Sequence, residues 1–411
     1  AVTVAKTALW IAESQMMKKT EDIVHMDLDF LPLKTYTNIV EGNALRIDWE
    51  DVVDKGKLNY IMGNPPFVGA SMQTKEQKED IMEVYKENGK NYSRSGKLDY
   101  VAGWYFKAAQ LMHRTNIETA LVSTNSVCQG ELVEDIWKPI YEKYDININF
   151  AHQTFIWDSE SSLKAHVHCV IIGFSCTKNN DKKKLYSNER MQFVENINAY
   201  LINAPNIFIQ SRKNPISNVF KCSRGNQPTD GGNLIIESCD YSEFITKEPL
   251  AKKYIKRLIG SQEFINSKER YCLWLVNVSP SEIKHMPLVM DRISKVKAMR
   301  LASTFEQTRE LANKPTTFRE TLNPASYIVI PRVSSERRKY IPMGFLDSDT
   351  IPTDSVIIIP DATIYYLGIL TSNIHMAWVR AFCGRLKSDY RYSKDIVYNN
   401  FPWCSPTEAQ R

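Results

Sequence analysis

The sequence predicts an α/β fold: a first domain built on a mostly parallel, doubly wound sheet, and a second domain of the α+β type. Over the first 175 residues, apolar runs typical of buried strands alternate with stretches of helical length. A parallel sheet requires this alternation, because each strand returns through a crossover helix. After a polar segment at 176–190 the pattern changes to short strands separated by turn residues. A chain of 411 residues also exceeds one ordinary core, which favours two domains.

The elements of the first domain can be placed in order. Helices are expected over 1–17, 74–90, 99–113 and 131–144. Strands are expected over 37–40, 58–62, 119–124, 146–151 and 166–175. The helix at 99–113 has a strongly aromatic face, formed by Tyr100, Trp104, Tyr105 and Phe106.

The second half of the chain is organised differently. Short strands are expected over 271–276, 327–330 and 356–359, and a last helix over 364–383. The domains proposed on this basis are 1–190, 191–365, and a C-terminal helix and tail at 366–411. Packing of that tail back on the first domain is one option.

The composition excludes several classes of protein. The chain is 43% apolar and 24% charged, as in globular proteins of aqueous compartments. No apolar run approaches the roughly 20 residues of a membrane span, and no signal peptide pattern is present, so we expect a cytoplasmic protein without membrane contact. The eight cysteines include no Cys-x-x-Cys pair, which favours reduced thiols over disulfides or a zinc site.

Positive charge is concentrated in one region. Residues 251–340 hold 18 Lys or Arg against 8 Asp or Glu, a net +10, so the rest of the chain carries −5 of the total +5. Such a region fits contacts with nucleic acid phosphates. A solvated basic surface is the alternative.

The clearest chemical motif is formed by Asn64, Pro65, Pro66 and Phe67, directly after the strand expected at 58–62. Methylating an exocyclic amine requires localising a nitrogen lone pair that is delocalised into the ring. Two acceptors aimed at the amine hydrogens achieve this, namely the side-chain oxygen of Asn64 and the main-chain carbonyl of Pro65. The prolines fix the direction of that carbonyl and offer no competing donor.

Phe67 adds a face on which a base can stack, and a base inside a duplex must be flipped out to be reached. The motif therefore predicts amino-group methyl transfer. A chance strand-ending turn is the alternative, and the motif alone does not separate adenine from a protein glutamine amide.

The wider sequence resembles the gamma-class adenine-N6 methyltransferases, and within them the fused restriction-modification enzymes of the MmeI-like (type IIL) family. The similarity is carried by 61–69, 98–105, 122–130, 154–160, 166–173, 263–266, 271–275, 331–338 and 375–392. The resemblance implies a Rossmann-like methyltransferase domain, a target-recognition domain, S-adenosylmethionine as cofactor and double-stranded DNA as partner. It also implies Mg²⁺ only for a nuclease part that is absent here. We expect a monomer.

One departure from the family pattern concerns the cofactor. The glycine-rich loop on the first strand and the acidic residue on the second strand do not occur in the sequence given, and the first helix has no cap before it. We therefore expect a fragment of a longer protein, inactive alone and with weak or no binding of S-adenosylmethionine.

The resemblance also implies roles for further residues. Asn43 and Ala44 match the position that contacts the cofactor adenine, with Asn64 and Tyr100 nearby. A strand-ending turn explains Asn43 equally well, and core packing explains Tyr100 equally well. Phe155 or Trp157 would stack on the flipped base opposite Phe67, with Phe155 favoured; a core role is the alternative for either.

DNA reading is expected from two clusters that mix phosphate donors with groups able to read base edges. Their members are Arg332, Ser334, Ser335, Glu336, Arg337, Arg338 and Lys339 in the first, and Arg385, Lys387 and Arg391 in the second. Solvated basic loops are the alternative.

Two other constellations are rejected as sites. His166 and His168 could share a strand face, but no third metal ligand is evident, so we expect no metal. Asp158, Ser159 and His166 lack the turn that a catalytic serine needs. The competing functions are a DNA-binding specificity module without catalysis, and N-methylation of RNA or of protein glutamine.

Overall fold

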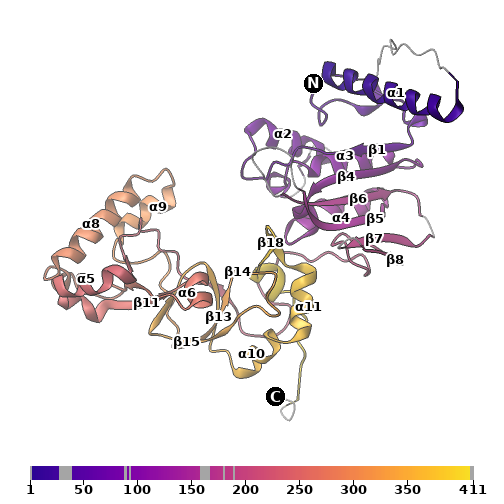
Figure 1. Cartoon of the computed structure of the whole chain (residues 1–411). Coiled ribbons are helices and arrows are strands. Elements are labelled where there is room, and N and C mark those ends of the chain that lie inside the picture. Colours follow the sequence, from indigo (N-terminus) through magenta and orange to yellow (C-terminus); the bar gives the residue numbers. More distant parts are fainter. Residues whose placement is uncertain are drawn as a thin grey trace. The chain divides into compact units, whose positions relative to one another are not determined.

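The computed structural model describes residues 2–26, 39–87, 90–91, 94–157, 167–178, 181–187 and 190–407 (Figure 1). The chain forms two compact units. The first contains Ala1–Cys128 and Leu132–Phe208, and the second contains Gln129–Glu131 and Ile209–Arg411. Within the described part, no helix is both long enough and apolar enough to cross a membrane.

A six-stranded sheet is the centre of unit 1. Its strands, in spatial order, are β1 (Tyr60–Gly63), β4 (Glu118–Thr124), β6 (Val167–Ser175), β5 (Asn147–Trp157), β7 (Lys183–Ser187) and β8 (Arg190–Val194). Figure 1 shows β1 and β8 at the two edges.

The expectation of a mostly parallel sheet is wrong, because the sheet is mixed. β1 runs parallel to β4, and β5 to β7, whereas β6 is antiparallel to both its neighbours and β7 to β8. Parallel neighbours need a crossover of a dozen or more residues. The connections after β5 and after β7 are shorter than that, so each following strand runs back.

The helices of unit 1 largely follow the expected order. They are α1 (Val2–Val24), α2 (Lys75–Val84), α3 (Ala102–Met112) and α4 (Leu132–Tyr144), with short turns η1 (Trp49–Asp51), η2 (Lys55–Lys57), η3 (Ser95–Lys97) and η4 (Asn125–Cys128) and a small ribbon of β2 (Lys86–Glu87) and β3 (Lys90–Asn91). α2 ends earlier than expected, and α1 extends beyond residue 17. The strand expected at 37–40 lies partly outside the described residues, and Ile39 and Val40 are not in a strand.

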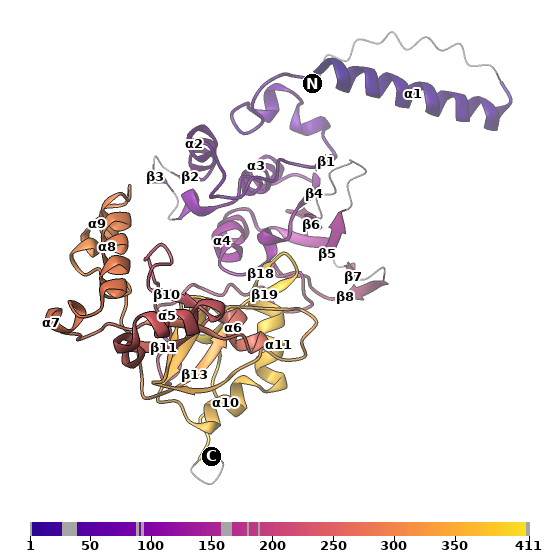
Figure 2. The ribbon, with the colours of Figure 1, turned by 60° about the vertical axis from the view of Figure 1, so that its left-hand side comes forward.

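α3 and α4 lie on the same side of the sheet (Figure 2), and aromatic side chains pack both helices against it. The ring centroid of Tyr105 on α3 lies 5.1 Å from that of Trp137 on α4 and 5.7 Å from that of Phe174 on β6. All three side chains are buried. The aromatic face expected for the 99–113 helix is thus largely packed in the core. This core holds the strands of the sheet in place, and the candidate site lies at the ends of these strands.

Unit 2 contains three sheets. The first is β10 (Ile235–Glu237), β12 (Arg270–Leu273), β11 (Ile255–Ile259) and β16 (Thr350–Pro352). The second is β15 (Gly344–Asp347), β13 (Ser326–Pro331), β17 (Val356–Pro360) and β9 (Ser223–Arg224). The third is β14 (Val333–Ser334), β19 (Asp389–Arg391) and β18 (Gly384–Leu386). The strands expected near 271, 327 and 356 are all present.

The helices of unit 2 lie around these sheets. They are α5 (Tyr241–Lys247), α6 (Ser261–Asn266), α7 (Pro280–Ile283), α8 (Pro287–Leu301), α9 (Glu306–Glu310), α10 (Ile364–Leu370) and α11 (Asn373–Phe382), with turns η5 (Ser238–Asp240), η6 (Pro249–Tyr254), η7 (Leu311–Asn313) and η8 (Lys394–Tyr398). The single helix expected over 364–383 is therefore two helices. Ser372 separates them because its side chain accepts a hydrogen bond from the His375 N–H at 3.2 Å and so caps α11.

One arginine organises the loops around α8. Arg300 is fully buried and donates to five main-chain carbonyls, those of Pro228, Thr229, Leu311, Lys314 and Thr317, at 2.7–3.3 Å. A buried guanidinium needs such partners, because an unpaired one would be costly.

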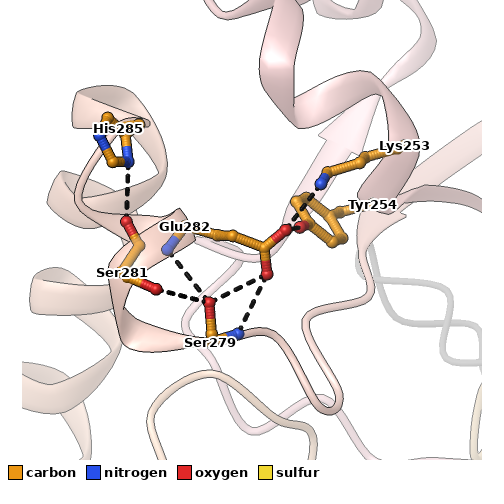
Figure 3. A network of polar contacts seen from close by, with 6 residues as sticks. All are labelled: Lys253, Tyr254, Ser279, Ser281, Glu282 and His285. Carbon is orange, nitrogen blue, oxygen red and sulfur yellow. Dashed lines mark hydrogen bonds and ion pairs between the residues drawn. The ribbon is translucent and has the colours of Figure 1, made fainter.

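A second polar network fixes the short helix α7 (Figure 3). Glu282 completes a capping box with Ser279, and its carboxylate also accepts from Lys253 Nζ at 2.8 Å and Tyr254 Oη at 2.7 Å. These contacts lower the pKa of Glu282 to about 2, with the Lys253 hydrogen bond as the largest cause. Because the pair is exposed, we assign it to local geometry rather than to a site.

Candidate active site and DNA-reading strands

The Asn64–Phe67 segment begins where β1 ends. β1 stops at Gly63 because the following Pro65 and Pro66 lack the N–H groups that a strand needs. Pro65 is buried, whereas Asn64, Pro66 and Phe67 are exposed. Among the described residues, the Asn64 side chain has no hydrogen-bond partner. The segment therefore combines a buried proline with an exposed amide and an exposed aromatic ring.

The turn after this segment is fixed by three consecutive residues. The Tyr100 N–H donates to the Val68 carbonyl at 2.9 Å, Asp99 Oδ1 accepts from the Ala70 N–H at 3.0 Å, and the Leu98 carbonyl accepts from Gln73 Nε2 at 2.8 Å. Residues 98–100 thus form a backing for residues 68–73.

The second oxygen of Asp99 reaches a different element. Ser126 Oγ donates to Asp99 Oδ2 at 2.6 Å, and the same hydroxyl lies 2.8 Å from Thr124 Oγ1 at the end of β4. A single carboxylate therefore joins the turn after β1 to the end of β4. The sequence offered no signal for this link beyond the position of Asp99 in the 98–105 segment, which resembles the family.

The aromatic candidates for base stacking lie on a strand. Phe155 and Trp157 are at the C-terminal end of β5, opposite Cys169 and Val167 of β6, after a bulge. Gly63, Leu121, Ile172 and Ala151 form one row across the sheet. Since β1, β4 and β5 run in the same direction, their C-terminal ends meet the same edge as Asn64.

The separation along that edge is three inter-strand spacings, about 14 Å at 4.8 Å each. The Trp157 side chain is 46% exposed, and its ring centroid lies 6.2 Å from that of Phe155. Both rings thus lie at the same edge of the sheet as Asn64. Asp158, Ser159 and His166 lie outside the described residues.

Asn43 belongs to a network centred on Asp80, which the sequence did not single out. Asp80 is buried on α2 and accepts hydrogen bonds from Asn43 Nδ2 at 2.8 Å, Arg46 Nε at 2.5 Å and Tyr100 Oη at 2.7 Å. Burial alone would raise the pKa of Asp80, but the three donors outweigh it and hold the pKa below its usual value. Burial, followed by the hydrogen bond to Asp80 and then by the Asp80 charge, raises the pKa of Tyr100 to about 12.

A pocket of about 610 Å³ lies between these groups and the Asn64 segment. Its lining includes Gly42, Ala44, Asn64, Pro65 and Trp104. Asn43 is not part of this lining, because its amide faces Asp80 and its oxygen accepts from the Leu45 N–H at 3.0 Å. Trp49 completes the lining and donates to the Ala44 carbonyl at 2.8 Å.

In unit 2, the two predicted DNA-reading clusters meet in the β14–β19–β18 sheet. Val333 pairs with Arg391 and Ser334 with Tyr390, and Tyr390 pairs in turn with Arg385. Segments about fifty residues apart in the sequence therefore form one surface. The sequence analysis predicted the two clusters separately and did not predict that they meet.

The side chains of these clusters differ in accessibility. Glu336, Arg337, Arg338, Lys339 and Arg391 are exposed, and Ser335 is half-buried. Ser334 is buried, and its hydroxyl has no hydrogen-bond partner among the described residues.

Arg385 and Lys387 shape the β18–β19 hairpin. The Arg385 guanidinium lies 3.9 Å from the centre of the Tyr390 ring and donates to the Ser388 carbonyl at 3.2 Å. Lys387 adopts the left-handed backbone region at φ +59° in the turn. The hairpin is thus stiffened by stacking before any ligand is present.

A further arginine, Arg224, lies close enough to Arg332 of this surface for its charge to act on it. Arg332 is half-buried and donates to the Asp354 carbonyl at 3.0 Å. Its pKa is lowered by burial first, and then by the positive charges of Arg224 and Arg391. Arg224 is exposed on β9, far from both clusters in sequence, which is why the sequence did not indicate it.

Among the described residues, no group of three or more His, Cys, Asp or Glu is arranged to hold a metal ion. His166 lies outside these residues, so the His166–His168 pair is not seen in full. The eight cysteines are free thiols, and four of them are buried.

The fold and these two surfaces define a DNA-methyltransferase domain followed by a DNA target-recognition domain. Residues 1–187 match the DNA-methyltransferase domain of MmeI, and residues 203–405 match the MmeI target recognition domain. The chain belongs to the MmeI-like family, as its sequence motifs indicated.

Two relatives support this assignment. The chain is 43% identical over 405 residues to DNA methyltransferase A of Bacillus subtilis (strain 168), covering 97% of this chain and 45% of that protein. It is 42% identical to the Type IIL restriction-modification enzyme MmeI in a structure with DNA, with a TM-score of 0.89, covering 98% of this chain and 54% of that chain. The chain therefore spans about half the length of these relatives.

Proposed function

We propose that this protein is the adenine-N6 methylating and DNA-reading part of a bifunctional restriction-modification enzyme that acts on specific sites in double-stranded DNA. The observation that carries the proposal is the Asn64–Phe67 segment: a free amide, a fixed proline carbonyl and an exposed ring at a strand end, bordering the 610 Å³ pocket. Membership of a DNA-methyltransferase family supports DNA as the substrate class.

In this proposal, the side-chain oxygen of Asn64 and the carbonyl of Pro65 accept the two hydrogens of the adenine amine. Buried Pro65 keeps its carbonyl fixed, so the acceptors need little reorganisation. Phe67 stacks on the flipped adenine, and Phe155 or Trp157 closes the site from β5.

The pocket suits the adenine ring of S-adenosylmethionine, because its volume lies in the range of small-molecule sites and its lining by Ala44, Trp104 and Trp49 is apolar. The cofactor would supply an electrophilic methyl group on its sulfonium. Asn43 and Tyr100 would act on this pocket through their shared partner Asp80, which holds the 42–46 turn in place.

The proposed target-recognition surface is the β14–β19–β18 sheet with its exposed neighbours. Arg338 and Glu336 would read base edges, where arginine suits guanine and glutamate suits the cytosine amine. The other cationic members, Arg332, Arg337, Lys339, Arg385, Lys387 and Arg391, would position the duplex through its phosphates, and Ser334 and Ser335 would support them.

The test is a methylation assay on duplex DNA with the complete bifunctional enzyme proposed above, because this chain alone is expected to bind S-adenosylmethionine weakly or not at all. Mass spectrometry of the nucleosides follows. We expect N6-methyladenine from the unmodified protein, and a loss of at least about 10²-fold for Asn64→Ala, since one preorganised acceptor is removed. Met72→Ala is the matched control, because Met72 is 78% exposed in the following turn. Methylation of RNA or protein instead of DNA, or DNA binding without any methyl transfer, would favour the competing functions.

A further inference from the structure

We infer that Asp99 is the positioning residue of the proposed methyl-transfer site. It holds the Asn64–Phe67 segment in a fixed position relative to the end of β4. This inference rests on the proposed function and concerns a residue outside the acceptor pair. The geometry assigns the role to Asp99 because its two carboxylate oxygens serve two different elements: the turn after β1 through the Ala70 N–H, and η4, directly after β4, through Ser126 Oγ.

The neighbouring contacts show why this carboxylate matters. Leu98 and Tyr100 also bond the turn, but through a main-chain carbonyl and a main-chain N–H that reach only residues 68–73. Among the described residues, Asp99 alone bonds both that turn and η4. Deleting its carboxylate removes the bridge and leaves the backing hydrogen bonds in place.

The acceptors themselves have little other support. In the described structure, the 64–67 segment makes only one hydrogen bond to the rest of the chain. The Val68 N–H, two residues further on, donates to the Pro66 carbonyl at 3.2 Å. The direction of the Asn64 side chain therefore depends on how the chain on either side is held. β1 holds one side, and the Asp99 bridge holds the other.

Small shifts at such a site have large kinetic effects. A reacting atom displaced by about 1 Å costs about 10²-fold in rate, and productive geometries are held to about 0.5 Å by a supporting set of hydrogen bonds. Asp99 supplies such a support, and both of its carboxylate oxygens are engaged by protein groups, so its loss should lower kcat rather than ligand affinity.

The experiment compares four variants of the intact protein: Asp99→Ala, Asp99→Asn, Ser126→Ala and Thr74→Ala. Thr74 caps α2 directly after the same turn, through a capping box with Gln77, and none of its hydrogen bonds in the described part of the chain goes to η4. It therefore controls for loss of stability near the turn without loss of the bridge.

We expect Asp99→Ala to lower kcat about 10²-fold, with KM for S-adenosylmethionine and for DNA little changed. Asp99→Asn keeps an oxygen for the Ala70 N–H and should recover much of the loss, and Ser126→Ala should fall between them. Thr74→Ala should lower the melting temperature yet keep its kcat. Equal kcat in Asp99→Ala and unmodified protein, or an equal kcat loss in Thr74→Ala, overturns the inference.

A second measurement separates this inference from the proposed function. Hydrogen exchange at the Ala70 amide should be faster in Asp99→Ala than in Thr74→Ala, whatever reaction the site performs. If unmodified protein does not methylate DNA adenine, the proposed function fails. If it does, but the Ala70 amide stays protected in Asp99→Ala, only the role of Asp99 fails.

Discussion

Asn43 Nδ2 donates to Asp80 Oδ2 across 2.8 Å, and this bond makes the turn before the pocket depend on a buried carboxylate of α2. Asn43 offers Asp80 a hydrogen and Leu45 an oxygen, so its amide suits both neighbours.

Asn43→Asp should therefore destabilise unit 1 more than Asn43→Ala does. The new carboxylate faces Asp80 at hydrogen-bond distance, and two such groups resist ionising together. We expect Asn43→Asp to cost about 1–3 kcal/mol at pH 8, and less at pH 5, where a proton can be shared. Thermal unfolding of both variants at the two pH values checks this; an Asn43→Asp protein as stable as Asn43→Ala at pH 8 would contradict it.

A buried histidine should make unit 2 sensitive to acid. Burial lowers the pKa of His375 to about 3, while its Nε2 lies 2.9 Å from the Tyr392 hydroxyl. Between pH 6.5 and about 3 the unfolded chain binds a proton that the folded chain does not, so stability falls as pH falls through this window. The slope should be about 1.4 kcal/mol per pH unit.

The check is denaturant unfolding of unit 2 from pH 7 to pH 4, followed by the fluorescence of nearby Trp378. His375→Gln should be less stable at pH 7 but show a flatter pH dependence. An unchanged slope in that variant would assign the acid sensitivity to other groups.

Arg300 should be among the most sensitive positions of unit 2. Arg300→Met leaves five carbonyls without their donor, and we expect a loss of at least about 3 kcal/mol. Arg300→Lys keeps the charge but has fewer donors in a different geometry, so its loss should be intermediate. Arg292→Met is the matched control on α8, because Arg292 donates to only two carbonyls, those of Asn233 and Ile235. Comparable losses at the two positions would refute the special role of Arg300.

Arg224 and Arg338 should affect DNA binding in different ways. If Arg224 contacts a phosphate, Arg224→Gln weakens binding to all duplexes similarly and reduces the slope of log K against log salt by about 1. Arg338→Ala should instead reduce the difference in binding affinity between the preferred DNA sequence and other sequences. Gel shifts at several salt concentrations measure both effects.

Lys284→Gln, at an exposed lysine directly after α7, is the control for removing any one positive charge. Identical behaviour of the Arg224, Arg338 and Lys284 variants would reject the division between phosphate contacts and base reading.

Local signals in the sequence predicted the parts of the molecule that depend on neighbouring residues. The two prolines located the end of β1, and the aromatic spacing of residues 100–106 located α3. Strand direction was missed, because an apolar run such as that of β6 looks the same whichever way the strand runs. Asp80, Asp99 and Arg224 were missed because their partners lie 20 or more residues away and only folding brings them together.

Arg300 affects how the amino-acid sequence of unit 2 can change during evolution. Among the described residues, all five of its hydrogen bonds go to main-chain carbonyls, and every residue type provides a carbonyl. The loops at 228–229 and 311–317 can therefore exchange side chains freely while the arginine keeps their paths constant. A domain held in this way can vary its outer sequence without rebuilding its interior.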